Sequence, residues 1–237
     1  MGKELERLAK YMRKFFPEEI EEIYNPFCGD GWLLKEFDDD TKKYGLDIEA
    51  EKIKEAEKQL KNFEGRTADA LAFKMGNKFN WIIAVPPLVG EWNPEKACQE
   101  MFEGWPCLPI YKRPQFAYIA HVLDALTVYG TAAVLMPMAA MWRKANEQDI
   151  RKYLIDKGYI ARVTETPEDM IPGTGIKTVV VTLTKAPDRV NLVGFADKEG
   201  HVVLVKPDKI AEHEYDLTPE IYLSEKRKTK DETKADE

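Results

Sequence analysis

The residues best suited to chemistry lie between Tyr24 and Trp32, in the run Tyr-Asn-Pro-Phe-Cys-Gly-Asp-Gly-Trp. This run follows a short apolar stretch, as a loop does at the end of a first strand. Gly29 and Gly31 allow the backbone to pass close to a bound ligand, because they have no Cβ. Ligands of open α/β sheets bind at strand ends of this kind. A plain tight turn uses the same two glycines, so the loop needs support from elsewhere in the chain.

Two carboxylates follow at the spacings that a nucleoside site requires. Asp47 ends the second strand pattern eighteen residues after Gly29, where a carboxylate can accept hydrogen bonds from both hydroxyls of a ribose. Asp69, in the run Thr-Ala-Asp-Ala-Leu at 67–71, ends a presumed third strand and is placed to accept a hydrogen bond from the amino group of an adenine. Each acid by itself is more often a surface group or a helix cap. Their order along the chain, each at the carboxyl end of a strand, predicts one nucleoside pocket.

Alternating strand and helix patterns from residue 3 to about residue 185 must position these groups. Apolar residues at helical spacing predict helices at 5–15, 53–63, 116–126 and 147–156. Short apolar runs predict strands at 20–24, 44–48, 81–85, 131–136 and 179–183. Gly130 is expected to end the helix before it, and Gly158 the last helix. This alternation predicts an α/β fold: a doubly wound, mostly parallel sheet with helices on both faces.

The same patterns divide the chain into three parts. Residues 1–185 are predicted to form one domain, large enough to bury a core. Residues 186–223 contain a strand pair at 192–195 and 201–205 and are expected to form a small extension packed on that core. Residues 224–237 have almost no apolar side chain, which predicts a disordered charged tail.

Composition excludes several classes of protein. Cys28, Cys98 and Cys107 form no CxxC pair and no histidines cluster, so we expect free thiols, no disulfide framework and no metal site. Without an apolar run of about 18 residues or a secretory signal, the chain is expected to be soluble and cytoplasmic, with no membrane partner. The net charge of −7 disfavours unaided binding to duplex DNA. Residues 111–113, Tyr-Lys-Arg, are a local basic patch, for which a solvated loop is the simpler interpretation.

Residues 25–31 read Asn-Pro-Phe-Cys-Gly-Asp-Gly. This resembles the Asp-Pro-x-Cys-Gly-Ser-Gly loop of the S-adenosylmethionine-dependent N6-adenine DNA methyltransferases, specifically of the modification subunit of type I restriction systems. Later segments are similar in the same order, so that the resemblance covers residues 15–223: they are residues 115–119, 133–137, 150–154, 173–178 and 215–223. It implies a class I methyltransferase fold for residues 1–185 and S-adenosylmethionine as the cofactor. The cofactor residues that it implies are Asn25, Pro26, Phe27, Cys28, Gly29, Gly31, Asp47, Ile48, Asp69 and Ala70.

The catalytic signature departs from that family. Its members carry Asn/Asp-Pro-Pro-Tyr/Phe, in which the amide and the first proline's carbonyl accept hydrogen bonds from the adenine amino group and the ring stacks on the flipped base. Here the signature reads Val85-Pro86-Pro87-Leu88. Valine offers no acceptor, and losing one such bond costs on the order of 100-fold in rate. Leucine offers no ring, and stacking contributes roughly 1–3 kcal/mol. The four residues are therefore a degenerate catalytic motif.

Other changes concern the cofactor loop and the insertion at 89–113. Asn25 replaces an acid and keeps a hydrogen bond to the methionine end of the cofactor but no charge attraction, while Asp30 replaces a serine and restores a charge nearby. Trp92 could supply a stacking ring, although a partly buried loop aromatic is the simpler interpretation. The insertion itself suits a lid, a partner surface or an ordinary packed loop.

Two hypotheses of function stay open at this point. The resemblance implies methyl transfer to a nucleic-acid base, with nucleic acid reached through a partner specificity subunit. The degenerate motif instead favours a catalytically inactive pseudo-methyltransferase that acts as a binding or regulatory partner in a restriction-modification or anti-restriction context. The two hypotheses separate at Val85 and Leu88. No oligomeric state is predicted.

Overall fold

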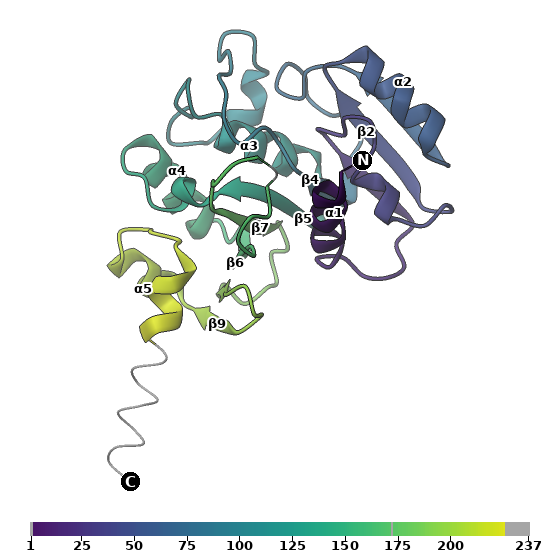
Figure 1. The fold of residues 1–237 in the computed structure, drawn as a ribbon. Helices are drawn as coiled ribbons and strands as arrows, with labels where there is room; N and C mark the ends of the chain where they lie inside the picture. Colours follow the sequence, from purple (N-terminus) through teal and green to yellow (C-terminus); the bar gives the residue numbers. More distant parts are fainter. Residues whose placement is uncertain (1, 172, 226–237) are drawn as a thin grey trace.

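The computed structural model describes residues 2–171 and 173–225, which contain one nine-stranded sheet with helices on both faces (Figure 1). Its strands are β1 Glu22–Asn25, β2 Lys42–Asp47, β3 Phe63–Thr67, β4 Phe79–Ala84, β5 Leu126–Pro137, β6 Ile160–Glu165, β7 Thr178–Thr184, β8 Val193–Ala196 and β9 Val202–Val205. Its α-helices are α1 Lys3–Arg13, α2 Ala50–Gln59, α3 Gln115–Ala125, α4 Asn146–Asp156 and α5 Pro207–Glu212. Short 3-10 helices lie at Leu34–Glu36, Gln99–Phe102 and Met138–Met141. The predicted α/β class is confirmed.

The strand order is β3-β2-β1-β4-β5-β7-β6-β8-β9. From β3 to β5 all neighbours are parallel, whereas β7 enters antiparallel between β5 and β6. The order reverses between β1 and β4, which makes this the switch point at which ligands of open α/β sheets bind. The loops after both strands therefore start side by side at one edge of the sheet.

The two faces of the sheet are covered by different helices. Side chains of α1 and α2 share a core with Ile83 of β4, and those of α3 and α4 share another with Ile82. These two adjacent isoleucines are both fully buried because successive strand residues point to opposite faces. A continuous apolar strand such as β4 is typical of a sheet covered on both sides.

Two element boundaries differ from the predicted ones. The helix expected at 53–63 ends at Gln59, and Phe63 begins β3, because Asn62 adopts a φ of 51° and turns the chain. The helix expected to stop at Gly130 ends at Ala125 instead. Strand β5 then passes through Gly130, where an added Cβ would lie 3.0 Å from the carbonyl oxygen of Asn80. This glycine permits close strand packing and does not end a helix.

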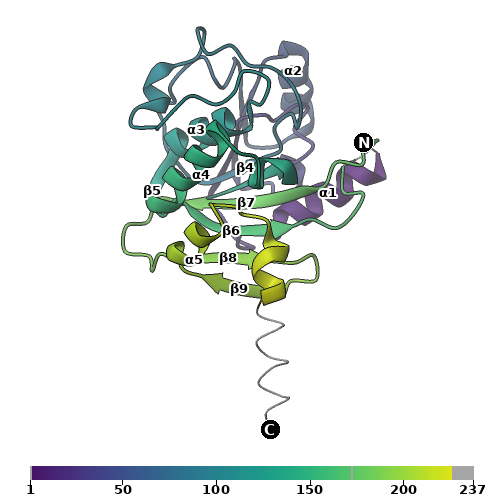
Figure 2. The ribbon, with the colours of Figure 1, turned by 90° about the vertical axis from the view of Figure 1, so that its left-hand side faces the viewer.

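Strands β6, β8 and β9 complete the sheet, as Figure 2 shows. The first of them was not predicted, because Arg162 and Thr164 interrupt its apolar pattern. The predicted pair β8 and β9 is present, and β8 joins the main sheet by pairing parallel to β6. The ring of Tyr222, in the helical residues 219–225, stacks on Phe195 of β8 with 4.0 Å between centroids. The division of the chain after residue 185 stays a prediction.

Most of the predicted tail, residues 226–237, lies outside the described residues. Among the helices that are described, none combines the length and the apolar character needed to cross a membrane.

Candidate functional site

A cavity of about 610 Å³ opens at the switch point, where the loops after β1, β2, β3 and β4 meet. The predicted site residues that line it are Pro26, Phe27, Gly29, Asp47, Ile48, Asp69, Ala70, Val85, Pro86 and Pro87. Residues that sequence reasoning did not assign also line it, among them Glu49, Ala68, Leu71, Glu91, Asn93 and Tyr118. The structure thus brings four separate strand ends to one cavity, within the size range of small-molecule sites.

The loop after β1 is shaped by its glycines. Gly29 has a φ of 54°, and its N–H donates a hydrogen bond to Oδ2 of Asp47 at 2.9 Å. Gly31 has a φ of 84°, and a Cβ there would lie 2.5 Å from Cδ1 of Leu60. The first glycine faces the cavity, while the second lets the loop pack against the chain just beyond α2. Gly31 does not line the cavity, so its role in ligand binding stays a prediction.

The side chains of Asn25 and Cys28 are buried beneath the loop after β1. The Asn25 side chain is fully buried, and its Oδ1 accepts the N–H of Phe27 at 3.0 Å. Its Nδ2 has no hydrogen-bond partner among the described residues. Cys28 is also fully buried, and its N–H donates to the carbonyl of Leu46 at 2.9 Å. Burial raises the pKa of the Cys28 thiol to about 12, so the thiol stays protonated. As expected, all three cysteines are free thiols.

The two predicted carboxylates lie at the cavity wall in fixed orientations. Asp47 accepts the Gly29 N–H at Oδ2 and the N–H of Glu49 at Oδ1, at 2.9 and 3.0 Å. Asp69 accepts the N–H of Leu71 at Oδ1, at 2.9 Å. Burial, with a smaller contribution from Asp69, raises the pKa of the lining Tyr118 to about 12, so this phenol stays neutral. Among the described residues, both carboxylates are therefore held by backbone donors and form no ion pair with a lysine or arginine.

The motif after β4 is split between two environments. Val85, Pro86 and Pro87 line the cavity. Leu88 does not line it; its side chain packs toward the α1 core, and its carbonyl accepts a hydrogen bond from Nε2 of Gln115 at 2.8 Å. Val85 offers only a hydrocarbon surface where the related signature has an amide. The catalytic role of these positions stays a prediction.

The insertion at 89–113 forms one wall of the cavity. Trp92 is 4% exposed, and its Nε1 donates to the carbonyl of Ile110 at 3.2 Å. It packs against Phe102 with 5.4 Å between centroids, so it is a buried loop aromatic as well as a lining residue. The hydroxyl of Tyr111 donates to Glu91 at 2.7 Å. The insertion is thus a packed part of the fold.

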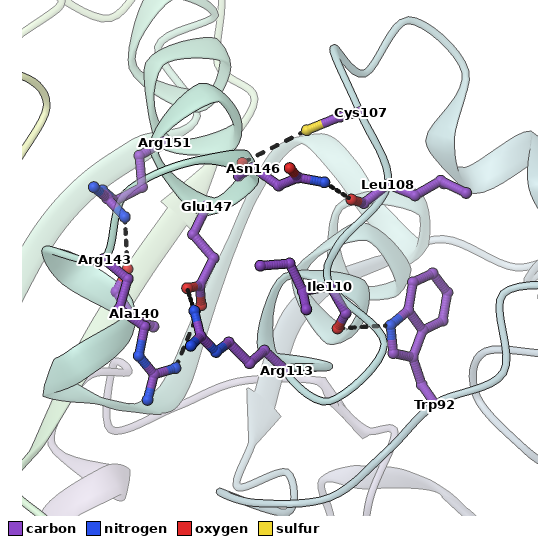
Figure 3. A network of polar contacts seen from close by, with 10 residues as sticks. All are labelled: Trp92, Cys107, Leu108, Ile110, Arg113, Ala140, Arg143, Asn146, Glu147 and Arg151. Atoms are coloured by element: carbon purple, nitrogen blue, oxygen red, sulfur yellow. Dashed lines mark hydrogen bonds and ion pairs between the residues drawn. The ribbon is translucent and has the colours of Figure 1, made fainter.

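Figure 3 shows how the insertion is fixed to the start of α4. Glu147, fully buried, receives Nη1 of Arg113 at 3.0 Å and Nη1 of Arg143 at 3.5 Å. Nδ2 of Asn146 donates to the carbonyl of Leu108 at 3.0 Å. Two guanidinium groups share one buried carboxylate, and the side chain of Arg113 is 42% exposed. Lys112 forms an exposed charge pair with Glu91 at 3.9 Å, as a solvated loop would. Sequence reasoning missed Glu147, because a glutamate in a first helical turn is normally exposed.

Comparisons with known proteins fit this architecture. A family model described as N-6 DNA Methylase matches residues 3–203. The methylase subunit of the type I restriction enzyme MpnII from Mycoplasma pneumoniae is 25% identical over 218 residues, covering 80% of this chain and 40% of that protein. The EcoKI methylase subunit of Escherichia coli is 30% identical over 71 residues, covering 30% of this chain and 13% of that protein. The chain spans less than half the length of these curated relatives.

Solved structures show the same fold. The methyltransferase subunit of a type I restriction-modification system from Streptococcus thermophilus superposes with a TM-score of 0.78 at 19% identity, covering 92% of this chain and 58% of that one. The EcoKI M protein superposes with a TM-score of 0.52 at 17% identity, covering 91% and 53%. The fold is that of the class I methyltransferases, and the cofactor of this family is S-adenosylmethionine. The chain belongs to the N-6 DNA methylase family.

Proposed function

We propose that the cavity at the switch point binds S-adenosylmethionine and that the protein is a methyltransferase of nucleic-acid bases. The observation that carries the proposal is the charge of the lining. Among the described lining residues are four carboxylates, from Asp47, Glu49, Asp69 and Glu91, and no lysine, arginine or histidine. An acidic cavity attracts a ligand with sulfonium and ammonium charges and repels the pyrophosphate of a dinucleotide.

The residues present fit the parts of such a cofactor. Asp47 lines the cavity with both carboxylate oxygens held by backbone donors, which supports its assignment to the hydroxyls of a ribose. Asp69 and Ala70 lie at the next strand end, at a place that suits an adenine. Asn25 is fully buried and does not line the cavity, so its contact with the methionine end of the cofactor stays a prediction. When bound, the cofactor supplies an electrophilic methyl group on a sulfonium.

The chain itself offers few groups that could hold the base to which the methyl group is transferred. The carbonyl of Pro86 remains as one acceptor for an amino group, and Val85 adds none. We therefore propose that transfer to adenine in DNA is slow or needs a further subunit. Because the curated relatives are methylase subunits of type I restriction enzymes, we propose that the chain acts in an assembly whose other subunits bring the nucleic acid.

The degenerate motif specifically favours a second candidate, an inactive cofactor-binding relative. In that case the cavity binds the cofactor, but no methyl group is transferred. The lining Val85 and the turned-away Leu88 support it.

Two measurements test the proposal. Calorimetry with S-adenosylmethionine and S-adenosylhomocysteine should give saturable binding, and no heat together with no thermal shift at saturating cofactor would refute it. Incorporation of tritiated methyl groups into duplex DNA, single-stranded DNA and RNA then separates the two candidates. Turnover supports the enzyme. Binding of the cofactor without turnover, also when the other subunits of such an assembly are added, supports the inactive relative.

A further inference from the structure

A second hollow lies beside the degenerate motif. Its volume is about 380 Å³, and its walls include Leu88, Val89, Trp142, Arg143 and Lys177. Val89 also lines the larger cavity, so the two spaces adjoin at the segment after β4. A ligand in the hollow would therefore lie next to the cofactor cavity without competing for it.

The charge of the residues that line this hollow is opposite to that of the larger cavity. Its described lining residues include Arg143 and Lys177 and no carboxylate. Its remaining surface is apolar, with Val89 71% exposed and Trp142 50% exposed. A large indole left half in water beside two cations is unusual for a group that normally buries its ring. An aromatic surface flanked by cations is how proteins hold an unpaired base and its phosphate.

The backbone around Trp142 is held in place by a hydrogen bond on one side and an ion pair on the other. It follows the 3-10 helix Met138–Met141, in which the N–H of Met138 donates to the carbonyl of Lys177 at 2.8 Å. The next residue, Arg143, contacts the buried Glu147, which also binds Arg113 (Figure 3). One carboxylate faces two guanidinium groups, so this side of the hollow keeps an excess of positive charge.

We propose that the hollow binds an unpaired base of a nucleic-acid strand, with Trp142 stacking on the base and Arg143 and Lys177 contacting its phosphates. Trp142 would thereby supply the ring that the motif lacks at Leu88. The inference rests on the proposed function, because it names the substrate surface of that same site. It does not depend on whether a methyl group is transferred.

The experiment uses the full chain and a short single-stranded oligodeoxynucleotide that carries one 2-aminopurine. Stacking quenches the fluorescence of this base, and anisotropy of a labelled copy gives the affinity. Trp142→Ala should weaken binding about tenfold or more and abolish the quenching, while Trp142→Phe should keep a large part of both. Lys177→Ala should weaken binding and lower the slope of log affinity against log salt by about 0.7.

Matched controls separate the hollow from general surface effects. Tyr129→Ala removes another exposed ring, 70% exposed, near the start of β5, and Lys54→Ala removes an exposed lysine of α2. Both should bind the oligonucleotide like the wild type. A duplex of the same sequence should bind more weakly than the single strand. Binding of S-adenosylhomocysteine should be equal in all variants, which keeps failure of this inference distinct from failure of the proposed function.

The inference is overturned if the wild-type protein does not bind the oligonucleotide at low salt. It is also overturned if Trp142→Ala binds it as tightly as the wild type, or if Trp142→Phe behaves like Trp142→Ala. An equal loss of affinity in Tyr129→Ala would likewise assign the binding to a different surface.

Discussion

Replacing Asp47 by alanine is expected to weaken the binding of S-adenosylhomocysteine at least tenfold. The carboxylate accepts two backbone N–H groups, from Gly29 at 2.9 Å and from Glu49 at 3.0 Å, which fix its direction in the cavity. Its lone pairs that remain are those that would accept the ribose hydroxyls. A hydrogen bond to a charged group contributes about 1.5–3 kcal/mol. Loss of one such bond already corresponds to about tenfold in affinity or more.

Two further variants sharpen this test. Asp47→Asn keeps an acceptor oxygen of nearly the same shape but no charge, so its affinity should fall between those of the wild type and Asp47→Ala. Asp39→Ala removes another carboxylate, which is exposed and pairs with Lys61 at 2.6 Å, and it should bind like the wild type. Titration calorimetry gives the affinities, and melting curves show whether each variant is folded. Wild-type affinity in a folded Asp47→Ala protein would refute the assignment of this strand end to the ribose.

Three other outcomes are expected. With excess enzyme and cofactor, the wild-type protein should incorporate no detectable methyl group into adenine of DNA, because Val85 and Leu88 replace an acceptor and a ring. Robust turnover would contradict this prediction. Recovery of methyl transfer in the Val85→Asn, Leu88→Phe double variant would support it. Glu147→Gln should lower the free energy of unfolding by about 1.5–3 kcal/mol in urea titrations, whereas Asp149→Asn, exposed on the same helix, should change it little. Burial lowers the pKa of the His121 imidazole from 6.5 to about 4. Between pH 6.5 and pH 4 the imidazole is therefore protonated in the unfolded chain but not in the folded one, so the free energy of unfolding falls as the pH falls through this range. His121→Gln should therefore lose less stability between pH 7 and pH 5 than the wild type, and an equal loss would show that this histidine does not contribute.

The strand ends of the site were predictable because local patterns encode them. Gly29 and Asp47 each follow an apolar run, and parallel strands deliver the residues after such runs to one edge of a sheet. The strand before Asp69, Phe63–Thr67, is mostly polar, so its end was inferred from its order along the chain. The alternation of strands and helices was enough to give the fold class. The sequence pattern was misleading at Gly130. Its context suggests the end of a helix, but this glycine lies within a strand and is required there for close packing.

The contacts that fix the insertion had no local signature. Arg113 and Glu147 are 34 residues apart, and neither residue type predicts burial. The same holds for the hollow beside Trp142, whose walls come from the loops after β4, β5 and β6. Such juxtapositions follow from how the loops pack, which spacing along one chain does not specify.

Because Cys28 is buried beneath the ligand loop, the reactivity of its thiol reports on the opening of that loop. This thiol is fully buried with a pKa raised to about 12, whereas Cys98 and Cys107 are partly exposed. A thiol reagent can reach Cys28 only when the loop opens, so the rate of its modification measures the frequency of local opening. A ligand that closes the loop should slow this one reaction and leave the other two unchanged. Mass spectrometry of a labelling time course would thus follow cofactor capture in the unmodified chain, without any engineered probe.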